Sequence, residues 1–345
     1  MPSLLSGAFL DKNLEMDTRK GYTICSFMVN NSFKKYRVAI VGAGVIGLYL
    51  SWKLSKSGYQ VTVFEKNSQV GQKPCSGLIS ERIKHLIPWD DSLAENKIDS
   101  CLIRFPGKEI NLKFKPVHFA VCRQKLDQYL YRLAREAGAK ILLGQRIEKM
   151  PSGFDKVIGC DGAFSFIRKN LSLPNPVFRL GIQGFMVEEN RSSYVEVWPV
   201  KSGFFWKIPR GEKTEYGFIG DPKTTKQEFK QQLSILGQDD LENIKAAIIP
   251  QGLIIPKSKD VTLCGDAMGL CKPWSGGGVI WGLTAAEILI RNFPNFEKYH
   301  REVKRFFGFR ILKGRLINNL VYFLGNNIPL TLPSRLTRDN DFPVF

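Results

Sequence analysis

The order of apolar and polar residues between Arg37 and Lys66 predicts a strand, a helix and a second strand in close succession. Val38–Val41 is a short apolar run that glycine follows, which is typical of a buried strand. From Val45 to Ser57 the apolar residues recur at helical spacing, and Gly58 ends the helix. Val61–Phe64 is apolar again and predicts the second strand. This order is typical of a doubly wound α/β domain.

The same pattern predicts further helices and strands along the chain. Helical spacing covers Ser80–Ile87, Arg123–Ala137, Lys226–Leu236 and Val279–Asn292. Short apolar runs predict strands at Cys101–Phe105, Glu109–Phe114, Phe119–Cys122, Lys140–Leu143, Lys156–Ile158 and Val261–Cys264. Between Phe178 and Asp221 the strands alternate, are rich in aromatic residues and are broken by glycines, which favours an antiparallel sheet.

The predicted fold class is α/β with α+β character. We expect a Rossmann-like nucleotide-binding domain, an inserted antiparallel-sheet substrate domain and C-terminal helices. The expected boundaries are a disordered extension at 1–35, the nucleotide domain at 36–175 and 251–295, the substrate sheet at 176–250 and a basic helical region at 296–345. Met28 precedes the first strand closely and is a second candidate for the translation start.

Three glycines and one acid between the first two strands predict a dinucleotide site. Gly42 allows a tight turn, Gly44 lets the backbone approach a pyrophosphate, and Gly47 lets the helix pack closely on the strand. The helix N-terminus offers free N–H groups and a partial positive charge to the pyrophosphate. Glu65 ends the second strand, where its carboxylate can accept hydrogen bonds from ribose hydroxyls. The alternative is a glycine-rich turn in another α/β protein.

The amino-acid composition indicates the charge that a binding partner of this protein would carry. The 345 residues carry a net charge of +18, which indicates an anionic partner: nucleic acid, an acidic membrane surface or a phosphorylated substrate. A basic proteome or solubility alone is the alternative. Seven scattered cysteines without a Cys-x-x-Cys pair favour a reduced, cytoplasmic chain, and three histidines far apart in sequence predict no metal site. No apolar stretch is long enough to span a membrane.

The tail from Arg301 to Arg315 interleaves cations with aromatic and aliphatic residues. This basic amphipathic pattern is typical of a helix on an anionic membrane surface. A terminal helix with its apolar face against the protein and its charges in water explains the pattern equally well. Peripheral membrane contact is therefore an expectation with an open alternative.

Two further glycine–acid clusters and one cysteine loop complete the candidate chemistry. Asp161-Gly162 follows a strand, and Gly265-Asp266 follows another, with Gly276–Gly278 just before a helix. Another glycine run at a helix start indicates a second close approach of backbone to a ligand. The loop Lys73-Pro-Cys75-Ser-Gly77 follows the second strand, so it is expected beside the cofactor.

With these clusters in place, the chain resembles the geranylgeranyl reductase family of flavoproteins, which share the p-hydroxybenzoate hydroxylase fold. The resemblance covers roughly residues 37–292. The loop around Cys75 is similar to the family's Pro-Cys-Gly-Gly loop, and Phe204–Pro209 is similar to its Tyr-x-Trp-x-Phe-Pro motif. Phe204, Ile208 and Ser76 depart from the family residues at their positions.

The resemblance implies FAD as the cofactor. The predicted FAD contacts are Gly42, Gly44, Val45, Ile46, Gly47, Glu65, Lys66, Cys75, Ser76, Gly77, Arg123, Ile147, Asp161, Gly265, Asp266, Gly277, Gly278 and Val279. The implied substrate contacts are Phe204, Trp206 and Pro209, and Phe205 is a further candidate for an apolar tunnel. Aromatic residues of an ordinary core are the alternative for these side chains.

The implied activity is reduction of C=C bonds in prenyl (geranylgeranyl) chains of isoprenoid lipids by hydride from reduced flavin. Cys75 is a candidate proton donor by position, and the alternative is that it only packs against the flavin. A flavin monooxygenase of the same fold and a non-enzymatic binder of prenyl groups remain the other functional hypotheses. Ferredoxin and NAD(P)H are both open as electron donor, and no nucleic acid partner is expected.

Overall fold

The computed structural model describes residues 36–343 except 201 and 239, so the predicted extension at 1–35 lies outside the described residues. The described residues form two β-sheets. One of them is parallel and has five strands in the order β13-β7-β1-β2-β6. The bounds are β1 Arg37–Val41, β2 Gln60–Phe64, β6 Lys140–Leu142, β7 Lys156–Gly159 and β13 Val261–Leu263. The central strand β1 pairs with β2 and β7, so its apolar run Val38–Val41 is buried, as both faces of a parallel sheet are.

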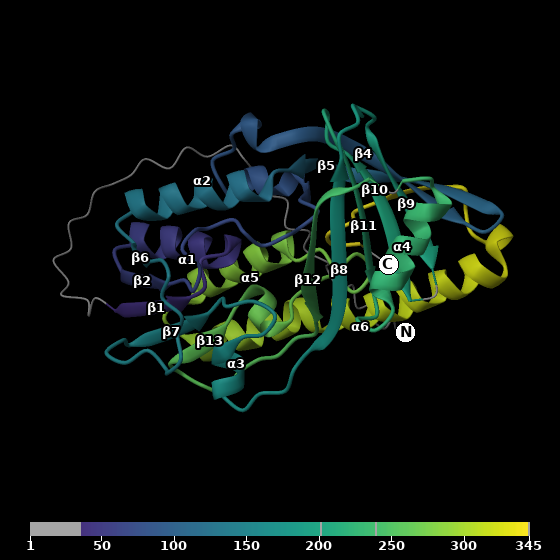
Figure 1. Cartoon of the computed structure of the whole chain (residues 1–345). Coiled ribbons are helices and arrows are strands. Elements are labelled where there is room, and N and C mark those ends of the chain that lie inside the picture. Colours follow the sequence, from purple (N-terminus) through teal and green to yellow (C-terminus); the bar gives the residue numbers. More distant parts are fainter. Residues whose placement is uncertain (1–35, 201, 239, 344–345) are drawn as a thin grey trace, which may run out of the picture. The chain divides into compact units, whose positions relative to one another are not determined.

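Helices cover this small sheet (Figure 1). They are α1 Val45–Lys56, α2 Arg123–Glu136, α3 Phe166–Asn170 and α5 Val279–Asn292. Helix α1 contacts α2 on one side and α5 on the other, and together with β1 they form the main hydrophobic core. The predicted Rossmann-like α/β architecture is confirmed.

The second sheet has nine strands and is larger than the sequence pattern indicates. Its order is β12-β8-β11-β10-β9-β4-β5-β14, and β3 pairs with β5. The bounds are β3 Leu78–Ser80, β4 Ala94–Phe105, β5 Lys108–Val121, β8 Val177–Met186, β9 Tyr194–Val200, β10 Gly203–Pro209, β11 Thr214–Gly220, β12 Glu242–Gln251 and β14 Arg335–Arg338. Most pairs are antiparallel, as predicted, but β4–β9 and β5–β14 are parallel.

The two faces of the large sheet bury different side chains. Helix α4, Thr225–Ile235, covers one face, where Phe205 and Phe218 pack against its Phe229. On the other face Trp206 and Ile208 belong to a separate apolar cluster. Because successive side chains of a strand point to opposite faces, β10 contributes to both layers.

Helix α6, Phe296–Asn327, is 32 residues long and begins where the Asn295 side chain accepts a hydrogen bond from the Lys298 backbone N–H. It contacts α5 and runs on along the large sheet (Figure 1), where the Tyr322 hydroxyl donates to the Gly203 carbonyl at 3.0 Å. None of the helices in the described part of the chain is both long and apolar enough to cross a membrane.

Several predicted elements differ from the structure. The helix expected at Ser80–Ile87 is a strand end followed by a 3₁₀ helix, Glu81–His85, because β3 pairs with β5 through Ser80. Phe119–Cys122 is not a separate strand, since β5 continues from Lys108 to Val121. The expected C-terminal helices are one long α-helix, a 3₁₀ turn at Pro329–Thr331 and the strand β14.

The large sheet also draws on more of the chain than the predicted substrate segment 176–250. Strands β3, β4 and β5 come from the predicted nucleotide domain, and β14 comes from the predicted helical tail. β12 and β14 escaped the sequence pattern. β14 holds Arg335–Arg338 and is largely exposed, so no apolar alternation marks it.

Candidate cofactor site

The turn after β1 is shaped by two glycines that meet backbone atoms. Gly42 has a φ of +102°, and a Cβ added there would lie 2.4 Å from the carbonyl oxygen of Cys160 on the neighbouring chain segment. A Cβ added at Gly47 would lie 1.9 Å from the Gly42 carbonyl oxygen. No other residue fits either position without moving the backbone.

Gly44 differs from these two glycines because a Cβ added there would meet nothing within 4 Å. It is the N-cap residue of α1 and provides no side-chain cap, so the first backbone N–H groups from Val45 onward have no side-chain acceptor at this position. Ile46 in the first turn is a packing residue, with its Cγ1 3.0 Å from a Cβ added at Gly265. The helix start can therefore accept an anionic group that approaches Gly44.

Glu65 is nearly buried at the end of β2 and is held by two backbone donors. The Ala43 N–H donates to its Oε2 at 2.8 Å, and the Asn67 N–H donates to its Oε1 at 2.9 Å. These bonds place the carboxylate beside the glycine turn. Lys66 next to it is exposed, and Ile147 is a half-buried residue in the loop after β6.

A buried arginine joins the Asp161-Gly162 turn to the Gly265-Asp266 turn. Arg168 donates to the Ala267 carbonyl at 2.7 Å and to the Ala163 carbonyl at 2.6 Å. Asp161 Oδ2 accepts from a backbone N–H of α3, whereas its buried Oδ1 has no partner within the described residues. Burial raises the pKa of this carboxyl. An unsatisfied buried acceptor of this kind indicates a donor that is absent from the protein itself.

Asp266 is paired in the structure with a residue that the sequence did not single out. Lys73, from the cysteine loop, forms a salt bridge with Asp266 Oδ2, and the Cys271 thiol donates to Oδ1 at 3.4 Å. Burial alone would raise the pKa of Asp266, but the Lys73 ammonium lowers it to below its ordinary value. The carboxylate is therefore ionised and already engaged by a cation.

The glycine triplet lies directly against this pair. A Cβ added at Gly278 would lie 3.1 Å from Asp266 Oδ1, and one added at Gly277 would lie 2.8 Å from Lys272 Cε. Gly278 is the N-cap of α5 without a side-chain cap, and Val279 is the first helical residue. A second helix N-terminus without a side-chain cap thus lies beside Asp266.

The cysteine loop reaches Arg123 at the start of α2. The Cys75 sulfur accepts from the Gly77 N–H at 3.4 Å, and Arg123 donates to Asp127 at 3.1 Å. Although burial alone would lower the pKa of Arg123, the nearby Asp127 carboxylate and Cys75 thiol raise it. The buried Nε of Arg123 has no partner in the described part of the chain, so it is a second polar atom free to meet a ligand.

A buried ion network, which sequence reasoning missed, connects the large sheet to the cysteine loop. Trp206 Nε1 donates to Glu215 at 3.0 Å, and Arg210 Nε donates to the same carboxylate at 2.8 Å. Arg210 also pairs with Glu95 and donates to the Ser76 carbonyl. Burial raises the pKa of Glu215, although Arg210 acts in the opposite sense. No spacing predicts this network, because Arg210 and Ser76 are 134 residues apart.

The structure separates the predicted substrate residues. Phe204 and Trp206 share one face of β10, with ring centroids 5.9 Å apart, in the cluster that also contains Ile219. Phe205 lies on the opposite face under α4, so the prediction that it lines the same tunnel is wrong. Strand alternation places Pro209 with Phe205 rather than with Trp206.

The cluster around Trp206 touches two of the predicted cofactor loops. Leu78, directly after the cysteine loop, packs against it. On the other side, a Cβ added at Gly276 would lie 2.6 Å from Cδ1 of Ile219, a cluster member. The apolar face of the sheet, the cysteine loop and the glycine triplet are therefore neighbours in space.

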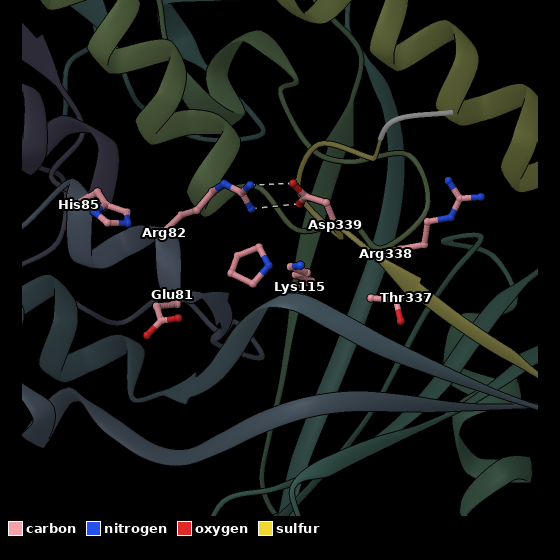
Figure 2. Close-up of a pocket in the computed structure, with 8 residues that line it drawn as sticks. Glu81, Arg82, His85, Lys115, Thr337, Arg338 and Asp339 are labelled. Atoms are coloured by element: carbon pink, nitrogen blue, oxygen red, sulfur yellow. Dashed lines mark hydrogen bonds and ion pairs between the residues drawn. The ribbon is translucent and has the colours of Figure 1, made fainter. Parts of the chain in front are cut away.

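A surface pocket of about 570 Å³ lies apart from these residues (Figure 2). It is lined by Glu81, Arg82, His85, Lys115, Pro116, Thr337, Arg338 and Asp339. Arg82 spans it with two hydrogen bonds to Asp339, of 3.0 and 2.7 Å. None of the predicted cofactor or substrate residues lines this pocket, so it is not the candidate site.

Comparison with known proteins places this geometry in context. Residues 40–73 match the family model of the NAD(P)-binding Rossmann-like domain. Geranylgeranyl diphosphate reductase from Rhodobacter capsulatus is 25% identical over 72% of this chain and 72% of its own length. The sequence match therefore extends beyond the fingerprint into the large sheet.

Solved structures share the fold. A geranylgeranyl bacteriochlorophyll reductase-like protein from Thermoplasma acidophilum has a TM-score of 0.73 at 18% identity, covering 84% of this chain and 88% of its own. A flavin-dependent halogenase from Xanthomonas campestris has a TM-score of 0.66 at 14% identity, covering 80% and 77%. The residues of the candidate site fit FAD. The helix starts at Gly44 and Gly278 have no side-chain cap, and Asp161 Oδ1 and Arg123 Nε are buried without a partner in the described residues.

Proposed function

We propose that this chain, whose sequence and fold fit the geranylgeranyl reductase family, reduces C=C bonds in the prenyl chains of isoprenoid lipids. The predicted resemblance to that family is confirmed, and the relatives support an FAD-dependent oxidoreductase. The observation that carries the finer proposal is the apolar cluster around Trp206, which touches both the cysteine loop and the glycine triplet.

An apolar wall suits a prenyl chain because the chain has no hydrogen-bonding groups. Burial of each CH₂ stabilises binding by about 0.8 kcal/mol, so affinity comes from contact area and position comes from shape. The Trp206 ring is fixed by its hydrogen bond to buried Glu215, which Arg210 holds in turn. A ring held in one orientation can define which double bond reaches the reacting position.

Reduced FAD, when bound, supplies the hydride from its N5. The second carbon of the double bond then needs a proton from the protein or from water. In this proposal Cys75 is a candidate donor, because its loop continues into Leu78 of the apolar cluster and its sulfur lies near Arg123. Packing of Cys75 against the ring is the alternative, and it assigns the proton to water.

The experiment is anaerobic reoxidation of the dithionite-reduced holoprotein by a geranylgeranyl lipid, with two aromatic-to-leucine variants on the same strand. We expect Trp206→Leu to keep FAD bound and to slow reoxidation at least about tenfold, because it removes the wall of the substrate site. Phe205→Leu, on the opposite face of β10, should lower stability and leave the reoxidation rate of the folded protein unchanged.

Equal effects of the two variants would contradict the proposal, since they would make Trp206 an ordinary core residue. The halogenase neighbour supports oxidative flavin chemistry on this fold as the second candidate. Oxygen consumption coupled to NAD(P)H, with no reoxidation by prenyl lipid under argon, would favour that candidate.

A further inference from the structure

Helix α6 is apolar on two opposite faces, only one of which the protein covers. Its inner face packs Val303, Phe307 and Ile311 into the main core. Its outer face carries Phe309, Leu312, Leu316, Leu320 and Phe323, which are between 54% and 68% exposed. The structure thus resolves the sequence alternatives in an unexpected way, because packing against the protein accounts for one apolar face and leaves another in water.

The outer residues form one continuous stripe. They follow one another at intervals of three and four residues, which keeps them on a single helix face. The stripe continues past the helix end through Ile328 and Leu330, of which Leu330 is 82% exposed. Contiguous apolar surface of this kind is uncommon on a monomer and marks an interaction site. We call the set Phe309, Leu312, Leu316, Leu320, Phe323, Ile328 and Leu330 the outer stripe.

Cations flank the outer stripe at its N-terminal part, since all Lys and Arg residues of α6 lie between Lys298 and Arg315. The sequence of α6 contains seven Lys and Arg residues and two Glu residues, and one of the acids, Glu302, is paired with Arg291 at 2.6 Å. Arg301, Lys304 and Arg305 are exposed one to two turns before the stripe begins. An apolar face with flanking basic residues is typical of helices that lie in the interface of an anionic bilayer. A protein groove would bury these cations, whereas lipid headgroups leave them hydrated and paired.

We infer that the outer stripe of α6 docks on an anionic lipid surface, with its apolar side chains in the headgroup boundary and its cations at the phosphates. The helix lies in the plane of the surface and does not cross it, because its inner face stays packed on the protein. The occupant is a membrane, and a second copy of the chain is the rival that the experiment must exclude.

Docking at this face would bring the predicted substrate sheet to the lipid. The inner side of α6 contacts Trp274, beside the glycine triplet, at Gly314, where an added Cβ would lie 2.7 Å from the indole. It contacts the start of β10 through the Tyr322–Gly203 hydrogen bond. The first residue of β10, the strand that carries Trp206, is therefore in contact with the helix that holds the outer stripe. The inference stands on the stripe itself and does not depend on the chemistry proposed above.

The experiment is sedimentation of the full-length holoprotein with vesicles of phosphatidylcholine, with and without phosphatidylglycerol. We expect the parent protein to bind the mixed vesicles and to be released in part by salt, because exposed charges are screened. Leu316→Asn with Leu320→Asn should lower partitioning at least about tenfold, since each leucine contributes apolar area to the interface.

Two control variants separate the apolar and the electrostatic contributions. Val187→Asn with Ile235→Asn removes two apolar side chains elsewhere that are at least as exposed as the two leucines, and it should leave vesicle binding unchanged. Arg301→Gln with Lys304→Gln and Arg305→Gln should lower binding to the mixed vesicles and weaken its dependence on salt, since the other Lys and Arg residues of α6 remain. Thermal melts of each variant check that the fold is retained.

Two results would overturn the inference. One is unchanged vesicle binding by the folded Leu316→Asn, Leu320→Asn variant. The other is a concentration-dependent dimer of the parent, seen by analytical ultracentrifugation, that this variant abolishes while neither protein binds vesicles. Reoxidation of the reduced holoprotein by detergent-solubilised prenyl lipid should be the same for parent and variant. Loss of vesicle binding with that rate retained separates the docking surface from the proposed reductase activity.

Discussion

The fingerprint turn at Gly42–Gly47 and the glycine triplet at Gly276–Gly278 both start a helix, but different contacts require their glycines. At Gly42 and Gly47 an added Cβ would collide with backbone carbonyl oxygens, which can move only if the backbone of the fold moves with them. At Gly277 and Gly278 it would meet the side chains of Lys272 and Cys271. The first turn is therefore fixed by backbone geometry, and the second is limited by side chains of the loop that directly precedes it.

The acids of the two regions differ in the same way. Glu65 is held by backbone N–H groups that are at most 22 residues away in sequence. Asp266 is held by Lys73, which is 193 residues away, and Lys272 under the triplet is held by Asp341 at 3.1 Å. We therefore expect stability and FAD binding at the fingerprint turn to change when a side chain is enlarged. At the glycine triplet we expect them to change with charge and pH.

The largest expected effect is that of Gly47→Ala. Its Cβ would lie 1.9 Å from the Gly42 carbonyl oxygen, so the helix must shift from the strand, and we expect a loss of about 3 kcal/mol in the free energy of unfolding. Gly277→Ala is the matched change at the triplet and should cost about 1 kcal/mol or less, since its Cβ would meet the side-chain atom Cε of Lys272 rather than a backbone atom. Urea unfolding of both variants measures the difference. Equal losses in the two variants would contradict the view that backbone contacts limit the first turn and side-chain contacts limit the second.

Gly44→Val should separate cofactor binding from folding. Because the position faces open space, the variant should melt within about 2 °C of the parent in the absence of FAD. Its branched side chain fills the approach to the helix N-terminus, so FAD affinity should fall by about 2 kcal/mol. Fluorescence titration with FAD gives the affinity. A folded variant with full FAD affinity would show that the pyrophosphate does not lie at Gly44.

The free energy of unfolding of the protein should fall in acid because of His118, which lies near Lys272 below the glycine triplet. Burial and the nearby Lys272 lower the pKa of His118 to about 4 from 6.5. The unfolded state binds the proton first, so stability is full above pH 6.5 and falls as the pH drops toward 4. Between pH 7.5 and pH 5 this histidine contributes a loss of about 2 kcal/mol.

The test compares urea unfolding of the parent and His118→Gln at the two pH values. The variant should lose about 2 kcal/mol less than the parent on acidification. His300, whose pKa burial also lowers to about 4, contributes to both proteins and cancels. Parallel losses in the two proteins would show that His118 is not the titrating group.

The smallest effect belongs to Asp266. Asp266→Asn removes a charged acceptor and should weaken FAD by about 1 kcal/mol, because the half-exposed Lys73 can turn to water. Lys73→Met should leave FAD affinity equal or higher, since it frees the carboxylate. Weaker binding in Lys73→Met than in Asp266→Asn would mean that the lysine, not the acid, holds the cofactor.

Sequence reasoning predicted the local parts of this molecule well. The strand–turn–helix at Gly42 depends on contacts within one continuous stretch, so its period and glycines are readable, as are α2, α4 and α5. What it missed depends on distant partners. The contacts of Lys73 with Asp266, and of Arg210 with Ser76 and Glu95, join residues more than 100 positions apart and leave no periodic pattern in the sequence.

The large sheet and α6 show a second limit. Alternation identified the aromatic strand at Phe204–Trp206 but could not say which face each ring joins, because both faces are buried. The exposed strand β14 carries no apolar signal. In α6 the sequence showed one amphipathic pattern, while the structure has two apolar faces, since only tertiary packing decides which one the protein covers.

The most direct measurement of the central claim is mass spectrometry of prenyl lipids after anaerobic incubation with the dithionite-reduced holoprotein. We expect a gain of two hydrogen atoms for each reduced double bond on geranylgeranyl chains, with fewer or differently placed reductions by Trp206→Leu. Lipids of unchanged mass, from a protein whose reduced flavin is reoxidised by oxygen alone, would contradict it.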